Sequence, residues 1–132
     1  MRAFLVCLLP LLLAGCEMTL PSAPSDLTTG IVIFEHANYL GRSAHVTTDI
    51  EDLRDYKEGP CETDSESGPD WNDCISSVRI APGWRATLYR NPDFKGESVE
   101  AASDLSNLQL EKGTCDHDGL NDCITSIRLH RP

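Results

Sequence analysis

Two short strings of oxygen-bearing residues are the part of this sequence best suited to chemistry. The strings are Asn72-Asp73-Cys74-Ile75-Ser76-Ser77 and Asn121-Asp122-Cys123-Ile124-Thr125-Ser126. Each offers carboxylate, hydroxyl and backbone carbonyl oxygens at close spacing, and Ca²⁺ binds six to eight hard oxygen ligands of these kinds. The same residue types can also simply make the hydrogen bonds of a turn. The strings therefore predict either paired calcium sites or paired turns, with calcium binding favoured.

The two strings close two copies of one repeated unit, which span residues 31–82 and 83–132. Each copy opens with an aromatic residue, four further residues, a second aromatic, one residue and a glycine. These residues are Phe34, Tyr39 and Gly41 in the first copy, and Tyr89, Phe94 and Gly96 in the second. The closing strings lie 49 positions apart and the openings 55, so the first copy has six extra residues in its acidic loop, 62–70. This self-similarity predicts that one supersecondary unit occurs twice.

Short apolar runs indicate strands rather than helices. Ile31 and Ile33 alternate with other residues, and the later runs around Val78 and Ile127 are equally short and bounded by Gly, Pro, Asn and Asp. Turn-forming residues, Asn38 in one copy and Asn91-Pro92-Asp93 in the other, stand between the aromatics and predict a tight hairpin in each. The residues alone therefore predict an all-β domain.

These paired hairpins and strings resemble the βγ-crystallin superfamily, and the resemblance covers both repeats. The first hairpin of the family's Greek-key repeat has the same aromatic and glycine spacing. Calcium-binding microbial members also carry a six-residue string in each repeat. It has Asn or Asp at the first two positions, any residue at the next two, Ser or Thr at the fifth and Ser at the sixth. Both strings of this sequence match it in full. The resemblance implies a Greek-key β-sandwich of two four-stranded sheets, with strand exchange between the repeats and two calcium ions at one end.

The resemblance also implies the ligands of each ion, because family members share each ion between the two repeats. The first site would take the Cys74 carbonyl, the Ser76 hydroxyl, the Glu35 carbonyl and the Asp122 carboxylate. The second would take the Cys123 carbonyl, the Thr125 hydroxyl, the Arg90 carbonyl and the Asp73 carboxylate. Asn72 and Asn121 are expected to brace the loops rather than touch the metal. One carboxylate per ion predicts weak binding, with a Kd of roughly 10⁻⁶ to 10⁻⁴ M.

Each string has a cysteine at its third position, which is a departure from the family. Another cysteine precedes it in the same repeat, so we predict the disulfides Cys61–Cys74 and Cys115–Cys123. Each bond would close a loop of roughly ten residues, stabilise the domain by about 2 to 3 kcal/mol and preorganise a calcium loop. The alternative is a zinc site with four thiolates, but the close cysteine pairs typical of such sites are absent.

The N-terminus predicts a lipid anchor. Arg2 precedes an apolar stretch that is too short to span a bilayer comfortably. The stretch runs into Leu13-Ala14-Gly15-Cys16, which resembles the lipobox of bacterial lipoproteins. We therefore expect a signal peptide over residues 1–15 and a lipidated Cys16. An ordinary secretory signal, with Cys16 a spare thiol, is the alternative.

A flexible tether and one folded domain are expected after the anchor. Residues 16–29 contain Pro and Ser without a hydrophobic period, and residues 30–132 form the domain. Two or three acyl chains would hold the chain stably on a membrane. Glu17 after the lipidated cysteine is not the Asp of an inner-membrane retention signal, so the outer membrane of a bacterial envelope is favoured.

The acidic composition limits the choice of partners. The formal net charge is −10, and the loss of Arg2 with the signal peptide would make it −11. Such a surface repels nucleic acid and suits divalent cations, although acidity also simply confers solubility.

No arrangement of residues indicates catalysis. The four histidines, His36, His45, His117 and His130, are scattered, and the sequence has no glycine-flanked serine and no phosphate-binding loop. The chain is therefore not expected to be an enzyme. Two classes of function remain: a calcium-stabilised envelope module with a structural or stress-protective role, and a protein-binding module such as an inhibitor or adhesion domain. The acidic loop is the best candidate for contact with a protein partner of unknown identity, although a solvated loop is the commoner case.

Overall fold

The computed structural model describes residues 26–61, 69–113 and 119–132. The expected signal peptide, Cys16 and the tether up to residue 25 lie outside these residues, as do Cys115, His117 and residues 62–68 of the acidic loop. Within the described residues, no helix has both the length and the apolar character needed to cross a membrane.

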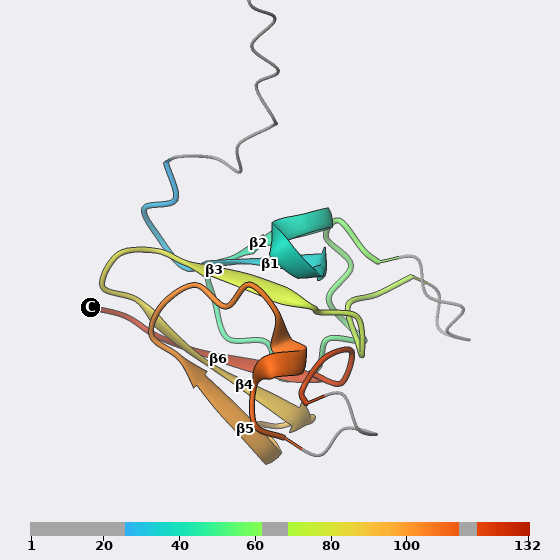
Figure 1. The fold of residues 1–132 in the computed structure, drawn as a ribbon. Helices are drawn as coiled ribbons and strands as arrows, with labels where there is room; N and C mark the ends of the chain where they lie inside the picture. The colour runs from blue at the N-terminus through green and yellow to red at the C-terminus, as the bar shows by residue number, and fades with distance from the viewer. Residues whose placement is uncertain (1–25, 62–68, 114–118) are drawn as a thin grey trace, which may run out of the picture.

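The described residues form strands joined by turns and two single-turn 3₁₀ helices (Figure 1). The elements of the first repeat are β1 (Ile31–His36), η1 (Ala37–Tyr39), β2 (Leu40–Val46) and β3 (Ser77–Ile80). The elements of the second are β4 (Arg85–Asn91), β5 (Lys95–Ala101), η2 (Leu108–Leu110) and β6 (Ser126–His130). The all-β prediction is confirmed.

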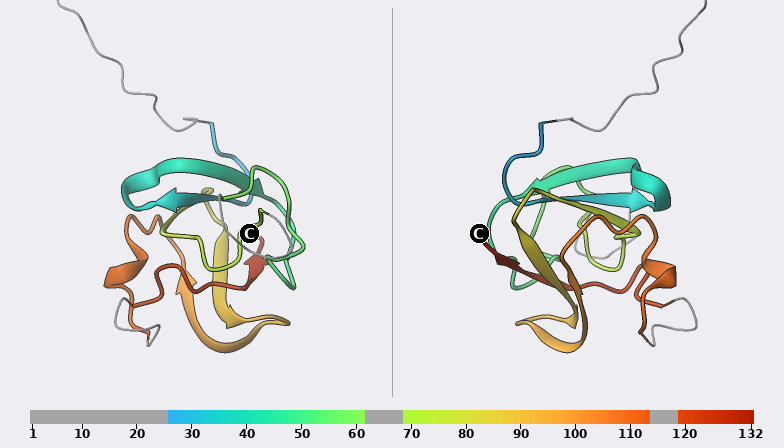
Figure 2. Two further views of the ribbon diagram at one scale, coloured as in Figure 1. Left: turned by 90° about the vertical axis from the view of Figure 1, so that its right-hand side faces the viewer. Right: turned by 60° about the vertical axis from the view of Figure 1, so that its left-hand side comes forward.

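The strands make two antiparallel sheets, with strand orders β2-β1-β3 and β5-β4-β6. Figure 2 shows the two sheets as two layers of one sandwich. Each repeat supplies one hairpin and the strand that begins at the last residue of its string, so the two sheets are built in the same way. The repeat in the sequence is therefore a repeat in the structure.

Each sheet is extended by a single residue of the other repeat, which confirms the expected strand exchange. Ile50 of the first repeat pairs with Ile127 in β6, with N···O distances of 2.8 and 2.9 Å. Leu105 of the second pairs with Val78 in β3, with two distances of 2.9 Å. The expected fourth strand is thus reduced to an isolated bridge in each sheet. Polar neighbours surround Ile50 and Leu105 in the chain, so only one side chain on each segment can enter the core.

Buried aliphatic side chains from both repeats fill the space between the sheets. Ile31 and Ile33 of β1, Val78 of β3, Leu88 of β4 and Ile127 of β6 all have an exposed fraction of 0%. Burial of each such side chain contributes roughly 1.5–3 kcal/mol to folding. Ile75 and Ile124, at the fourth position of each string, are also fully buried. The core therefore holds both candidate calcium loops in place.

The aromatic and glycine pattern folds each hairpin over its sheet. Phe34 and Tyr39 pack edge to face with ring centroids 5.7 Å apart, and Tyr89 and Phe94 do the same at 5.9 Å. Gly41 has a φ of +79°, and a Cβ there would lie 2.7 Å from the His36 ring. This position therefore requires glycine, as the hairpin pattern predicts.

The serine at the end of each string forms hydrogen bonds to the backbone of the hairpin in the same repeat. The Ser77 hydroxyl donates to the His36 carbonyl at 2.6 Å and accepts from the Tyr39 backbone N–H at 3.0 Å. Ser126 makes the same pair of bonds, at 2.6 and 3.1 Å, to Asn91 and Phe94. Both serines are fully buried. Each string is thereby tied to the hairpin of its own repeat.

Candidate metal centre

The two strings meet across the boundary between the repeats. The backbone N–H of Asp73 donates to the Ile124 carbonyl, and that of Asp122 donates to the Ile75 carbonyl, both at 3.2 Å. Asp73 and Asp122 have φ values of +53° and +52°, in the left-handed region that Asp tolerates better than most residues. This reciprocal pairing places the second residue of each string beside the fourth and fifth of the other.

Each string is also joined to the hairpin residue that precedes an expected carbonyl ligand. The Ser76 N–H donates to Phe34 at 2.9 Å, and the Thr125 N–H donates to Tyr89 at 2.8 Å. The antiparallel pairing of β1 with β2 shifts register between Phe34 and His36. The pairing of β4 with β5 shifts register between Tyr89 and Asn91. Glu35 and Arg90 therefore lie where the backbone departs from the regular ladder, as in a β-bulge.

The structure brings together residues of the first expected site from different repeats. The Ser76 hydroxyl donates to a carboxylate oxygen of Asp122 at 3.1 Å, across 46 positions of sequence. Ser76 is buried, and Cys74, whose carbonyl is an expected ligand, lies two residues earlier in the chain. A hydroxyl and a carboxylate of opposite repeats are thus already at contact distance.

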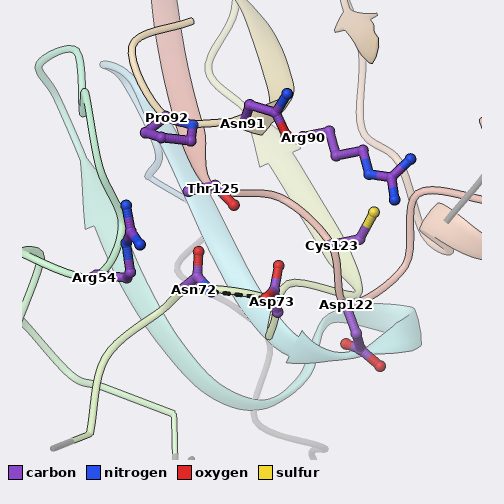
Figure 3. A pocket seen from close by; sticks show the side chains of 9 residues that line it. All are labelled: Arg54, Asn72, Asp73, Arg90, Asn91, Pro92, Asp122, Cys123 and Thr125. Atoms are coloured by element: carbon purple, nitrogen blue, oxygen red, sulfur yellow. Dashed lines mark hydrogen bonds between the residues drawn. The ribbon is translucent and has the colours of Figure 1, made fainter. Parts of the chain in front are cut away.

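The second expected site lies at a cavity of about 350 Å³ (Figure 3). All four of its residues line that cavity: Asp73 from the first repeat, and Arg90, Cys123 and Thr125 from the second. In Figure 3 the Asp73 carboxylate and the Thr125 hydroxyl point toward the same space. Carboxylate, hydroxyl and backbone carbonyl oxygens are the ligands that Ca²⁺ prefers, so the donor set fits that ion.

The surroundings of Asp73 penalise its negative charge. Burial raises the pKa of Asp73 above its ordinary value, and the hydrogen bond from Asn72 opposes this rise. The carboxylates of Asp70 and Asp122 raise this pKa further, whereas the Arg54 guanidinium lowers it. A cation beside a carboxylate favours its ionised form. A bound divalent ion would therefore relieve the penalty at Asp73.

The first residue of each string braces the second. The side-chain amide of Asn72 donates to Asp73 at 2.7 Å, and that of Asn121 donates to Asp122 at 2.6 Å. The two bonds match the bracing role expected for these asparagines. They orient the two carboxylates.

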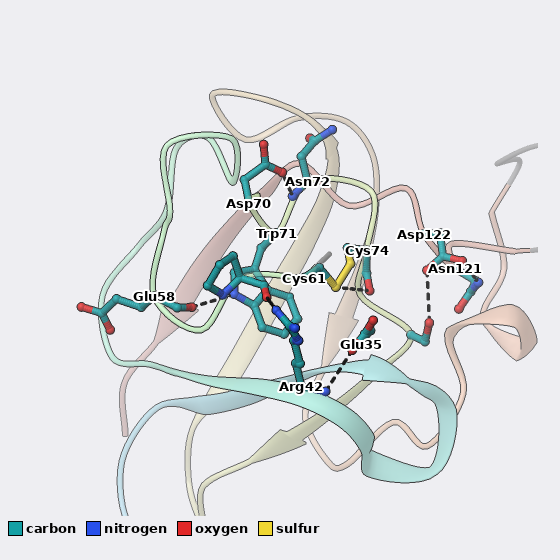
Figure 4. Close-up of a disulfide and its surroundings, with 12 residues drawn as sticks. Glu35, Arg42, Glu58, Cys61, Asp70, Trp71, Asn72, Cys74, Asn121 and Asp122 are labelled. Atoms are coloured by element: carbon teal, nitrogen blue, oxygen red, sulfur yellow. Dashed lines mark hydrogen bonds between the residues drawn. A yellow bond between two sulfur atoms is a disulfide. The ribbon is translucent and has the colours of Figure 1, made fainter. Parts of the chain in front are cut away.

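A disulfide fastens the first string to the loop before it (Figure 4). Cys61 and Cys74 are bonded, with Cα atoms 6.4 Å apart, which confirms one predicted bridge. The Cys61 sulfur lies 3.7 Å from the Cys74 carbonyl oxygen, but an oxidised sulfur carries no proton to donate. Cys123 is also disulfide-bonded. Its predicted partner, Cys115, lies outside the described residues, so that pairing stays a prediction.

The sequence did not point to two features of the site. Arg54 lines the cavity and donates to both carboxylate oxygens of Asp52, yet its turn carries no motif. The hydrogen bonds of Ser77 and Ser126 to the hairpins were also missed, although both serines close the repeated strings. Three or more His, Cys, Asp or Glu side chains do not cluster as metal ligands anywhere in the described chain.

The sequence is similar to those of several known proteins. Residues 33–101 match the model of peptidase inhibitor family I36. Spherulin-3A of Physarum polycephalum is 29% identical over 99 residues, which are 74% of this chain and 78% of that protein. The development-specific protein S homolog of Myxococcus xanthus is 34% identical over 58 residues, which are 44% of this chain and only 28% of that longer protein.

Solved structures agree with the sequence matches. A βγ-crystallin domain from Flavobacterium johnsoniae is 31% identical, with a TM-score of 0.55 over 76% of this chain and 93% of that one. The N-terminal domain of protein S, at 23% identity, shares the fold with a TM-score of 0.59 over 78% of this chain and 97% of that one. The two repeats, the β-bridges between them and the paired strings agree with these matches. This chain belongs to peptidase inhibitor family I36, a βγ-crystallin-like family.

Proposed function

We propose that this chain is a calcium-binding module, stabilised by two Ca²⁺ ions and carried on a lipid anchor in a bacterial envelope, with a structural or stress-protective role. The observation that carries the proposal is the cavity at the second site. It gathers Asp73 of one repeat with Arg90, Cys123 and Thr125 of the other. These are the residues that the family resemblance implies for one shared ion.

An ion at each site would supply the positive charge that the paired strings lack. The chain's own residues position the oxygens: Ile75 and Ile124 anchor the strings in the core, and Asn72 and Asn121 orient the carboxylates. Because each ion would join both repeats, unfolding of the sandwich would release it. At a free calcium concentration of one hundred times the Kd, one site adds about 2.7 kcal/mol to the free energy of unfolding.

Calorimetric titration of the metal-free, oxidised chain from Glu17 onward with CaCl₂ tests the proposal. We expect two ions per chain, and loss of one site, or at least a hundredfold rise in its Kd, in Asp73→Ala and in Asp122→Ala. Each variant removes the carboxylate that the resemblance assigns to one site, and ligand charge sets calcium affinity. Because the strings are paired, each variant also weakens the neighbouring site.

Glu100→Gln is the matched control for these variants. Glu100 is an exposed carboxylate on β5 that pairs with Arg85, away from the strings. Its replacement removes one charge and should leave both Kd values within about twofold. Calcium binding that neither aspartate variant changes would refute the ligand assignment.

Peptidase inhibition is a second candidate function, favoured by the family match over residues 33–101. The described disulfide lies within the matched stretch, and a cross-linked domain is well suited to resist cleavage while it occupies a peptidase. Titration of serine peptidases and metallopeptidases with the calcium-loaded chain tests this function. Stoichiometric inhibition would establish it, whereas cleavage of the chain without inhibition would count against it.

The lipid anchor is tested separately through Cys16→Ala. We expect the parent to take up labelled palmitate and to sediment with membranes, whereas the variant lacks the label and no longer sediments. The thiol of Cys16 is the atom that the lipobox resemblance assigns to acylation. Equal labelling of the two proteins would exclude this anchor.

A further inference from the structure

Asn72 carries a buried oxygen atom that needs a partner. Its side-chain Oδ1 is shielded from solvent and accepts no hydrogen bond from the described part of the chain. A buried acceptor without a partner is destabilising, and such atoms are uncommon in folded proteins.

The orientation of the Asn72 amide is set by its neighbour. Its Nδ2 donates to Asp73 at 2.7 Å. A turned amide would place the oxygen against the carboxylate, where neither atom has a proton to share. Oδ1 therefore stays on the side away from this bond.

Asn72 lies beside the cavity of the second site. Asn72 lines the cavity together with Asp73 and Thr125, and in Figure 3 the oxygens of these three side chains point toward a common space. Arg54 lies at the same cavity, but its guanidinium donates to both oxygens of Asp52. It donates no hydrogen bond to Asn72 Oδ1.

We propose that the side-chain oxygen of Asn72 is a direct ligand of the cation in the second site, which makes the two sites unequal. The inference rests on the proposed function, because it adds a fifth protein oxygen to one of the proposed calcium sites. Asn121 makes the equivalent brace to Asp122, yet its Oδ1 is not among the buried unpaired atoms of the described residues. Asn72 therefore has two roles, brace and ligand, and Asn121 has one.

Three variants separate the two roles in calorimetric titrations with CaCl₂. Asn72→Ala removes brace and ligand, and we expect the Kd of one site to rise at least tenfold. Asn121→Ala removes a brace of the same geometry, and we expect a change of less than about threefold. Asn72→Asp loses the brace but keeps an oxygen and adds charge, so its Kd should equal or fall below that of the parent.

Carbon NMR supplies a readout that a bracing role alone would not move. Saturation with Ca²⁺ should shift the side-chain carbonyl resonance of Asn72 by more than that of Asn121. Equal losses of affinity in the two alanine variants, or weaker binding by Asn72→Asp, would overturn this inference while two ions still bind the parent. A parent that binds no calcium would overturn the proposed function as well.

Discussion

Replacement of Trp71 by alanine is expected to lower the free energy of unfolding by about 3 to 5 kcal/mol, which is typical for a large buried aromatic residue. The Trp71 side chain is 0% exposed, and its indole N–H donates to the Glu58 carbonyl at 2.7 Å (Figure 4). The variant would leave both a cavity and an unpaired carbonyl. Urea unfolding followed by far-UV circular dichroism measures the loss.

Trp71→Leu is the control, because the second repeat has Leu120 at the matching position, also 0% exposed. Leucine restores apolar volume but not the hydrogen bond, so we expect about half the loss of the alanine variant. Trp71 also directly precedes Asn72 and Asp73, so the alanine variant should weaken calcium binding at the second site. A loss below about 1 kcal/mol in Trp71→Ala would contradict the buried position of the indole.

Removal of the Cys61–Cys74 disulfide is expected to cost about 3 kcal/mol in the absence of calcium. The bond joins residues 13 positions apart, and a closed loop of about this size restricts the unfolded chain by roughly that amount. Cys61→Ala/Cys74→Ala leaves both replaced positions in the core, where Cys61 is 0% and Cys74 is 9% exposed. Unfolding in urea, with EDTA present throughout, measures the difference from the oxidised parent.

Calcium should more than offset this loss. Saturation at one hundred times the Kd adds about 2.7 kcal/mol for each site, close to the contribution of the disulfide. Two saturated sites would together add about 5.4 kcal/mol, so the double alanine variant in excess calcium is expected to be more stable than the parent in EDTA. The same unfolding midpoint with and without calcium would show that the variant no longer binds the ion, and an unchanged midpoint on removal of the disulfide would refute its stabilising role.

The sequence predicted the fold well where a structural requirement falls on residues close together in the chain. The spacing of Phe34, Tyr39 and Gly41 is a property of one hairpin, and its second occurrence at Tyr89 predicted the second hairpin. Strand exchange was expected from the family resemblance. The number of strands in each sheet was not predicted correctly, because four were expected and each sheet has three. The expected fourth strand is a single bridge, at Ile50 in one sheet, because the polar residues around Ile50 do not continue the pairing with β6.

The sequence by itself determined that the chain has two like units, each closed by a string rich in oxygen donors, because these features are set by local spacing. Only the tertiary structure decided which donors face one another. Asp73 reaches the cavity beside Thr125 through the exchange of hydrogen bonds between the strings, and the oxygen of Asn72 is turned inward by its bond to Asp73. Contacts between residues some fifty positions apart follow from the packing of two sheets on one core, which no local pattern encodes.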